Sequence, residues 1–365
     1  MRSERTRAPL SRRSEGGRPR FLAPPASGIE PAPAPTFSVI IAAYQAADTI
    51  GDALDSIRQQ TVPPLEVVLC DDGSTDDLDA ALAPYLDEIV LVRQDNRGEG
   101  SAKNVAARAA RGDFVVILDA DDVYLPGRLE ALRKLAQTRP DLDILTSDAI
   151  LVAAGRAVRK AYDHTWRFEV ADQRRAILQG NFIFGHAAVR RTLLLEHGGF
   201  DEAIRWTTDW DMWLRLILAG ARAGSVDEPL ALYRLRETSL TARRRELLLG
   251  KLATLEKARS NASLRASERP VLEEAIAAHR RELALLDFRR GVAAGDTGVR
   301  RRAFALARTR GYAPRARLEA LAIGAALGVG RRLLRRRSDR GWVGAGGTYV
   351  PRSAAERDAG ARSRG

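Results

Sequence analysis

Short apolar runs alternate with amphipathic segments between residues 37 and 138, and this alternation constrains the fold more than any other feature. Each amphipathic segment carries apolar residues at helical spacing. Strands without polar alternation are typical of parallel sheets that helices cover on both faces. We therefore predict an α/β fold with a mostly parallel, Rossmann-like sheet flanked by helices. The four apolar runs are FSVIIAA from Phe37, LEVVLC from Leu65, EIVLV from Glu88 and FVVIL from Phe114.

The alternation weakens after about residue 145, and the chain becomes helical in pattern from about residue 241. The second part of the predicted domain contains strands at 146–152, 181–191 and 228–235, with a helix at 207–220. The N-terminal segment is basic and rich in Pro and Ala, which predicts disorder. The predicted organisation is a disordered leader at 1–35, an α/β domain at 36–240, a helical Arg-rich region at 241–340 and a flexible tail at 341–365.

Charge is unevenly distributed along the chain. Residues 36–240 hold 23 Lys and Arg against 32 Asp and Glu, whereas residues 241–365 hold 29 against 12. An enzyme acting on nucleic acid would carry basic charge on its catalytic body, so nucleic acid is not expected as a partner. The basic C-terminal region fits peripheral contact with an anionic membrane surface, or simply a solvated Arg-rich helix surface.

The C-terminal stretch 318–337 leaves the same two interpretations open. It is a core helix with a solvated charged end, or an interfacial helix on the cytoplasmic leaflet. No stretch has the roughly 18 apolar residues that a spanning helix needs, and the N-terminus lacks the apolar core of a signal peptide. The single cysteine, Cys70, fits a reducing compartment. We therefore expect a cytoplasmic protein, placed at the inner face of the plasma membrane if the tail binds lipid.

Acidic clusters follow two of the predicted strands: CDDGSTD after the second and LDADD after the fourth. The carboxyl ends of parallel strands meet at one edge, where ligands bind in such sheets. The three carboxylates of Asp119, Asp121 and Asp122 repel one another at this spacing. They form either a solvated turn or the binding site of a cation that joins them to an anionic ligand.

Six motifs, in order, resemble the family 2 glycosyltransferases, which have the GT-A fold. The resemblance runs from Phe37 to Leu240. It implies an inverting enzyme that moves a sugar from a nucleotide-diphosphate sugar, a UDP-sugar above all, to a glycan or lipid-linked acceptor, as in cell-wall or polysaccharide biosynthesis. The motifs are SVIIAAYQAADTI, LEVVLCDDGSTD, DNRGEGSAKNVAARAARGDFVVILDADD, GGFDE, TTDWDMWLRL and DEPLALYRLRETSLT.

The resemblance also implies roles for residues at the strand ends. Asp72 would recognise the nucleobase, and its alternative is an acidic turn with a helix cap. Lys103, where relatives often have Arg, would bind the diphosphate. Asp119 would contact the ribose, and Asp121 would ligate Mn²⁺ or Mg²⁺ in the manner of an Asp-x-Asp motif. The base pocket would be lined by Ala42 and Tyr44.

Two further roles come from the later motifs. Asp209 is the implied general base, with Asp211 in reserve, although both are also placed where a helix dipole stabilises carboxylates. Relatives often have His at the position of Arg236. Since arginine cannot ligate a cation, Arg236 either contacts the diphosphate directly or leaves the metal to Asp121, the diphosphate and water.

Two other functions remain as alternatives. A phosphotransferase would use the Asp119/Asp121 pair as nucleophile and acid/base, but Val123 stands where such enzymes have Thr. A non-catalytic protein would bind membrane or nucleic acid through the basic tail, although the acidic body argues against nucleic acid.

Overall fold

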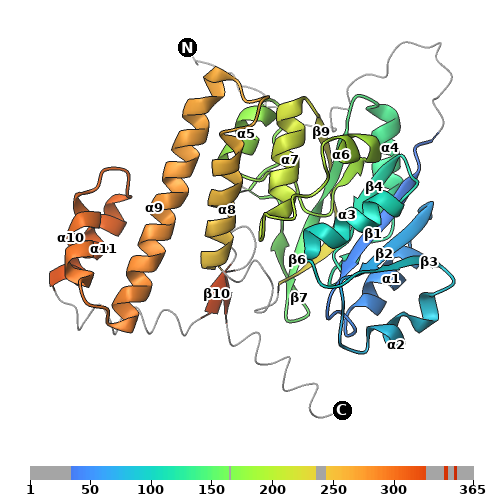
Figure 1. The fold of residues 1–365 in the computed structure, drawn as a ribbon, viewed down its shortest axis with the longest axis horizontal. Coiled ribbons are helices and arrows are strands. Elements are labelled where there is room, and N and C mark those ends of the chain that lie inside the picture. The colour runs from blue at the N-terminus through green and yellow to red at the C-terminus, as the bar shows by residue number, and fades with distance from the viewer. Residues whose placement is uncertain (1–33, 164–165, 236–243, 326–340, 344–348, 352–365) are drawn as a thin grey trace, which may run out of the picture. The chain divides into compact units, whose positions relative to one another are not determined.

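A computed structural model describes most of the chain (Figure 1). Most of the predicted leader and Arg236, one of the predicted donor-binding residues, lie outside the described residues. The described ranges are 34–163, 166–235, 244–325, 341–343 and 349–351.

A nine-stranded sheet is the central element of the fold. Its strands are β1 (Phe37–Ala43), β2 (Glu66–Asp71), β3 (Ile89–Arg93), β4 (Phe114–Ile117), β5 (Val123–Tyr124), β6 (Ile144–Ala153), β7 (Arg156–Lys160), β8 (Ala188–Arg190) and β9 (Ala223–Leu235). They follow the order β3-β2-β1-β4-β8-β6-β9-β5, and β7 pairs with β6. The first four strands coincide with the predicted apolar runs and pair in parallel. The second half is mixed, because β8 runs antiparallel to β4 and β6 while β6 and β9 are parallel.

Helices cover both faces of the sheet, and this explains why its central strands are apolar without interruption. On β1, Ile40 points into one core cluster, whereas Val39 and Ile41 point into another. The first cluster lies under α3, α5 and α7, and the second under α1, α2 and α4 (Figure 1). These helices and the short α6 are α1 (Ile50–Arg58), α2 (Leu78–Leu82), α3 (Glu99–Ala109), α4 (Arg128–Thr138), α5 (Gln173–Gln179), α6 (Arg191–Glu196) and α7 (Thr208–Ala219).

The predicted strand at 181–191 is wrong for most of its length. Only Ala188–Arg190 forms a strand, β8, and residues 181–187 form a loop. Two polar side chains in this loop contact distant parts of the chain: Asn181 bonds to Asp209 and His186 to Asp122. The loop therefore does not pair with a neighbouring strand. The strand β7 and the helices α5 and α6 were not predicted, because their segments have no clear apolar period.

The C-terminal part of the chain is helical, as predicted. It forms α8 (Arg244–Ala258), α9 (Arg269–Ala294), α10 (Val299–Arg308) and α11 (Pro314–Ala325). Leu252 and Leu255 of α8 belong to the same core cluster as α7. Helix α8 therefore completes the core of the sheet domain. In the stretch expected to be a flexible tail, β10 (Gly341–Val343) and β11 (Tyr349–Pro351) pair antiparallel.

None of the helices in the described ranges is long and apolar enough to cross a membrane.

The turn between α3 and β4 depends on a glycine. A Cβ at Gly112 would lie 2.7 Å from the backbone nitrogen of Ser38 and 2.8 Å from its hydroxyl oxygen. We expect Gly112→Ala to lower the free energy of unfolding by about 1–3 kcal/mol, because the tightly packed backbone of β1 would have to move. Urea denaturation measures this difference.

Gly180→Ala is the matched control. Gly180 has extended backbone with φ 178°, and a Cβ there would have no neighbour within 4 Å. Its substitution should change the free energy of unfolding by less than about 0.5 kcal/mol. Equal losses in the two variants would contradict the packing argument.

Candidate active site

The carboxyl ends of β1, β2 and β4 bring three predicted site residues to one edge of the sheet. Tyr44 follows β1, Asp72 follows β2, and Asp119 lies two residues beyond β4. The parallel pairing of these strands makes their ends adjacent. Tyr44 is 53% exposed and Ala42, one of the last residues of β1, is half-buried, so this edge is open to a ligand.

Asp72 is buried and organises the loop that leads from β3 into α3. Its Oδ1 accepts hydrogen bonds from Gln94 Nε2 at 2.6 Å and from the Arg97 amide at 2.9 Å. Its Oδ2 accepts one from the Gly98 amide at 2.8 Å. Since each carboxylate oxygen has two lone pairs, Oδ2 retains one acceptor site for a further donor.

A second set of hydrogen bonds joins the turns that follow β1 and β2. The side-chain oxygen of Gln45 accepts from the amides of Thr75 at 2.7 Å and Asp76 at 3.2 Å. Asp76 in turn accepts from the Ala47 amide at 2.8 Å. Gln45 therefore fixes the shape of this edge beside Tyr44.

Lys103 supplies the cation at this edge. Only 5% of its side chain is exposed, and its Nζ donates to Glu99 and, at 2.8 Å, to Asp119 Oδ1. Burial opposes the charged form, but the attraction of the two carboxylates outweighs it, so the pKa of Lys103 is raised. Conversely, burial would raise the pKa of Asp119, but the charge of Lys103 and its hydrogen bond hold the pKa below its ordinary value. Both groups are therefore charged.

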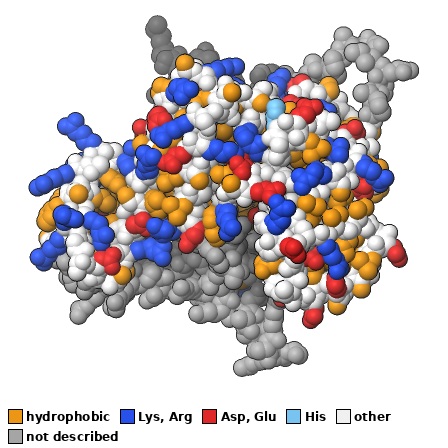
Figure 2. Space-filling model, viewed as in Figure 1, with side chains coloured by type: hydrophobic (Ala, Val, Ile, Leu, Met, Phe, Trp, Pro, Cys, Tyr) orange, Lys and Arg blue, Asp and Glu red, His pale blue; other side chains and the backbone are white. Residues whose placement is uncertain are grey.

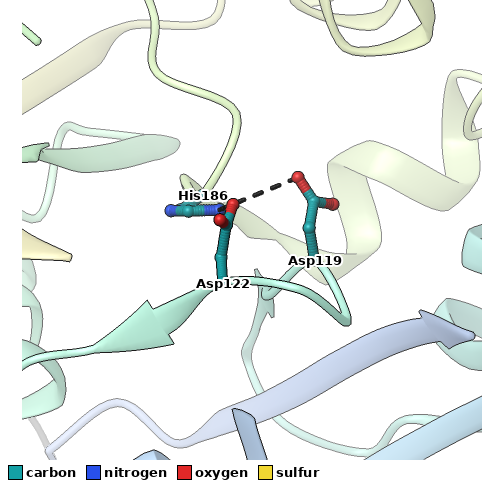
Figure 3. Close-up of side chains that lie close together, drawn as sticks. All are labelled: Asp119, Asp122 and His186. Atoms are coloured by element: carbon teal, nitrogen blue, oxygen red, sulfur yellow. Dashed lines mark hydrogen bonds and ion pairs between the residues drawn. The ribbon is translucent and has the colours of Figure 1, made fainter. Parts of the chain in front are cut away.

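Asp119, Asp122 and His186 lie together, as Figure 3 shows, and one ligand atom from each lies within 4.8 Å of the others. His186 Nε2 is 2.7 Å from Asp122 Oδ2 and 3.8 Å from Asp119 Oδ2. Carboxylates are ligands of Mn²⁺ and Mg²⁺, whereas an imidazole is a ligand of transition metals such as Zn²⁺ and Fe²⁺. The structure thus provides a group that could hold a divalent cation at the predicted Asp-x-Asp loop.

Asp122 is the most enclosed member of this group. Its Oδ1 accepts from the Arg234 amide at 2.7 Å, and its Oδ2 contacts His186. Burial raises the pKa of Asp122 although the His186 contact opposes the shift. Because Arg234 lies in β9, Asp122 joins the loop after β4 to this strand.

Asp209 lies in the first turn of α7 and is half-buried. Its Oδ2 accepts from Asn181 Nδ2 at 3.0 Å, and its Oδ1 from the Trp210 amide at 2.7 Å. Burial raises the pKa of Asp209 to about 6; the Trp210 amide and Lys103 oppose this shift. Such a carboxylate is still largely ionised near neutral pH and is a stronger base than an ordinary aspartate.

Asp211, the reserve candidate for the base, occupies a different environment. It is 2% exposed. Its Oδ2 accepts from Arg215 Nε at 2.9 Å, and its Oδ1 from Lys257 Nζ of α8 at 2.8 Å. Asp211 is therefore a buried partner of two cations, and its contacts attach α8 to α7.

The loop 181–186 is the part of the site that sequence reasoning missed. Asn181 bonds to Asp209, and His186 at the other end contacts Asp122 and Asp119. Between them, a Cβ on Gly185 would lie 3.7 Å from Asp209 Oδ2. One loop therefore supports both the candidate base and the candidate metal group. The only signal in the sequence was a pair of polar residues around a short apolar run.

Comparison with known proteins agrees with the resemblance. Residues 38–198 match the model of glycosyl transferase family 2. Over these residues the chain is similar to glycosyl transferase family 2. The succinoglycan biosynthesis protein ExoU of Rhizobium meliloti is 36% identical over 208 residues, which are 52% of this chain and 60% of that protein. An uncharacterised glycosyltransferase of Rickettsia typhi is 28% identical over 193 residues, 50% of this chain and 59% of that protein. The chain thus spans about three fifths of the length of these relatives.

Solved structures share the fold of the family 2 domain and its C-terminal helices. S. aureus TarS matches with a TM-score of 0.56 at 18% identity, over 83% of this chain and 91% of that one. The mannosyltransferase PcManGT of Pyrobaculum calidifontis, in complex with GDP-Man and Mn²⁺, matches with a TM-score of 0.55 at 21% identity, over 88% and 83%. The predicted GT-A fold is confirmed by this likeness.

The raised pKa of Asp209 predicts how stability depends on pH. The folded protein binds the Asp209 proton more tightly than the unfolded chain, so this contribution to stability is present below pH 3.8 and is lost as the pH rises through about 6. Asparagine does not ionise, so Asp209→Asn should not lose stability in this way as the pH rises. We expect the variant to be more stable than the wild type by about 1–2 kcal/mol above pH 7, with the difference shrinking toward pH 4. Chemical denaturation across this pH range measures it.

Asp211→Asn is the control on the same helix. It weakens a buried contact with Arg215 and Lys257, so it should lower the free energy of unfolding by about 2 kcal/mol or more. A loss of stability in Asp209→Asn at pH 8 would contradict the burial argument.

Proposed function

We propose that the chain is an inverting glycosyltransferase that moves a sugar from a UDP-sugar to a hydroxyl of a glycan or lipid-linked acceptor. The observation that carries the proposal is the placement of Asp209. Its carboxyl is half-buried, has a raised pKa, and lies close enough to Lys103 and Asp119 for their charges to act on it. A base and an anion-binding cation thus belong to one site.

The donor would bind at the edge formed by β1, β2 and β4. Tyr44 and Ala42 would line the base pocket, and the remaining acceptor site on Asp72 would take the imide N–H of uracil. Asp119 would contact the ribose, and Lys103 the diphosphate. Arg236, for which the family resemblance implies contact with the diphosphate, would add positive charge there.

The relatives support a nucleotide-sugar as the donor. TarS has been solved with UDP and with UDP-GlcNAc, and PcManGT with GDP-Man and Mn²⁺. ExoU is named for succinoglycan biosynthesis, which favours a polysaccharide as the acceptor class. For the same reason we propose that the enzyme works in the cytoplasm, at the inner face of the plasma membrane where glycans are assembled.

The residues after β4 fit a divalent cation, Mn²⁺ or Mg²⁺, with Asp121 as the ligand that the family resemblance implies. Asp119 offers a second carboxylate, 30% exposed, whereas Asp122 and His186 are almost wholly buried and already in contact. Asp122 and His186 would therefore fix the position of the loop. When bound, the cation would neutralise charge on the leaving diphosphate.

The chemical step follows from the position of the base. Asp209 takes the proton of the acceptor hydroxyl, and the oxygen attacks the anomeric carbon from the face opposite the diphosphate. The C–O bond to the diphosphate breaks, and the configuration at that carbon inverts, as it does with a base on the opposite face in inverting glycosidases. The hydrogen bond from Asn181 holds the Asp209 carboxylate in place.

The phosphotransferase alternative is less well supported. A nucleophilic Asp119 would need to approach phosphorus, but its Oδ1 is held by Lys103 at 2.8 Å. The hydroxyl that such enzymes place after the motif is absent, since Val123 occupies the position. Trapping of a covalent phosphate on Asp119 would favour this alternative over glycosyl transfer.

Donor binding and the base are tested together. A thermal-shift screen of UDP-, dTDP- and GDP-sugars with Mn²⁺ should raise the melting temperature with UDP-sugars most. Asp209→Asn should retain this shift but lose about 10²–10⁴-fold in turnover, because only proton removal is lost. Asn181→Asp replaces the donor to Asp209 Oδ2 with a second carboxylate, so it should also lower turnover. If no nucleotide-sugar binds at millimolar concentration, the proposal is wrong.

Metal binding is tested with Asp121→Asn. In the presence of UDP, this variant should bind Mn²⁺ at least tenfold more weakly by electron paramagnetic resonance. Asp122→Asn should instead lower the melting temperature, because it breaks a buried contact with His186. Unchanged Mn²⁺ affinity in Asp121→Asn would rule out its role as a ligand.

A further inference from the structure

The hairpin formed by α10 and α11 (residues 299–325) has its own small core. This core is separate from the two clusters that fill the sheet domain. Side chains of the hairpin that face away from this core therefore belong to none of the three core clusters. The buried residues are Phe288 and Val292 of α9, Val299, Ala303, Leu306 and Ala307 of α10, and Ala320 and Ile323 of α11.

Helix α11 is apolar on two faces, and its small core uses only one of them. Leu318, Leu321, Ala322 and Ala325 follow the spacing of a single helix face, and all four are exposed. Leu318 is 66% exposed and Leu321 is 43% exposed. Phe304 of α10, 42% exposed, extends this face, since a Cβ on Gly324 would lie 3.5 Å from its ring. We call these five residues, Phe304, Leu318, Leu321, Ala322 and Ala325, the apolar stripe.

The stripe is set in a strongly basic surface. The hairpin contains seven arginines and one acidic residue, Glu319, which pairs with Arg289. Among the described residues, no carboxylate lies within ion-pair distance of five of these arginines. Figure 2 shows Lys and Arg side chains gathered around hydrophobic ones in this part of the molecule. The five arginines are Arg300, Arg301, Arg308, Arg310 and Arg315, and all are exposed.

We propose that the α10–α11 hairpin docks on the surface of a bilayer that contains anionic phospholipids. The arginines would meet lipid headgroups, and the apolar stripe would enter the boundary between headgroups and acyl chains. Each arginine near such a surface contributes about fivefold to the partition coefficient. Stable peripheral binding requires two contributions. Here the five arginines supply attraction to anionic headgroups, and the two leucines supply apolar burial.

The positive charge of the hairpin, together with its apolar stripe, favours an anionic bilayer over other binding partners. A second copy of the chain would bring its own seven arginines against the first set. Nucleic acid would bind the arginines through its phosphates, but its backbone offers no apolar surface for the exposed leucines. The docking does not depend on the proposed enzymatic activity, so it can be tested without a donor or acceptor.

Vesicle co-sedimentation of the full chain tests the proposal. The protein should pellet with vesicles of phosphatidylcholine and phosphatidylglycerol, but not with phosphatidylcholine alone. Leu318→Ser with Leu321→Ser should weaken binding at least tenfold, and Arg300→Glu with Arg301→Glu by at least tenfold as well. Both pairs are exposed, so melting temperatures should remain unchanged.

Matched controls lie elsewhere on the surface. Leu65 and Leu86 are 48% and 50% exposed, and Arg156 and Lys160 are exposed cations. Leu65→Ser with Leu86→Ser, and Arg156→Glu with Lys160→Glu, should leave vesicle binding within twofold of the wild type.

Three results would overturn the proposal. The first is equal binding to the two kinds of vesicle. The second is a loss of binding in the arginine variant with none in the leucine variant, which would make the surface a general anion site. The third is a dimer in light scattering that the leucine variant converts to a monomer, because a second copy would then cover the apolar stripe.

Discussion

The candidate site depends on a buried contact between Asp122 and His186. These residues are 64 positions apart and belong to different loops, and the backbone of Arg234 in β9 completes the contact at Asp122. Three segments are thereby fixed together: the acidic loop after β4, the loop before β8 and the end of β9. Removing either side chain would leave the other unsatisfied in the interior, which costs more than the contact itself contributes. The positions of Asp119 and Asp121 depend on this anchor.

Lys103 makes an acidic edge compatible with folding. Without it, burial would raise the pKa of Asp119, and the pKa of Asp209 would be higher still. The lysine is almost fully enclosed, so its charge is little screened and acts on the carboxylates of Asp119, Glu99 and Asp209. One buried cation thus keeps Asp119 ionised, while Asp209, which it does not contact directly, retains a raised pKa. The two acids of the site acquire different properties from their surroundings.

The sequence predicted the sheet because its strands are buried on both faces, a property that leaves a continuous apolar run in the chain. It also predicted which strand ends would meet, since that follows from parallel order. It did not predict Asn181 or His186. Asn181 meets Asp209 across 28 residues and His186 meets Asp122 across 64, and neither pairing follows from local spacing. The loop between them was mistaken for a strand because Phe182, Ile183 and Phe184 are apolar, although they pack in the two core clusters and not in a ladder.

The attachment of α8 to α7 links two parts of the chain that the sequence separates. Gly250 permits the close approach, since a Cβ there would lie 2.7 Å from the Arg205 carbonyl oxygen. The Thr207 and Thr254 hydroxyls, 2.9 Å apart, and the Lys257–Asp211 ion pair extend the same seam. The first turn of α7, which contains Asp209, is therefore held in place by α8, and both helices lie beyond the family match. Substitutions in α8 could therefore shift the position of Asp209 without any contact between α8 and a substrate. A loss of activity in such a variant would not imply that α8 binds substrate.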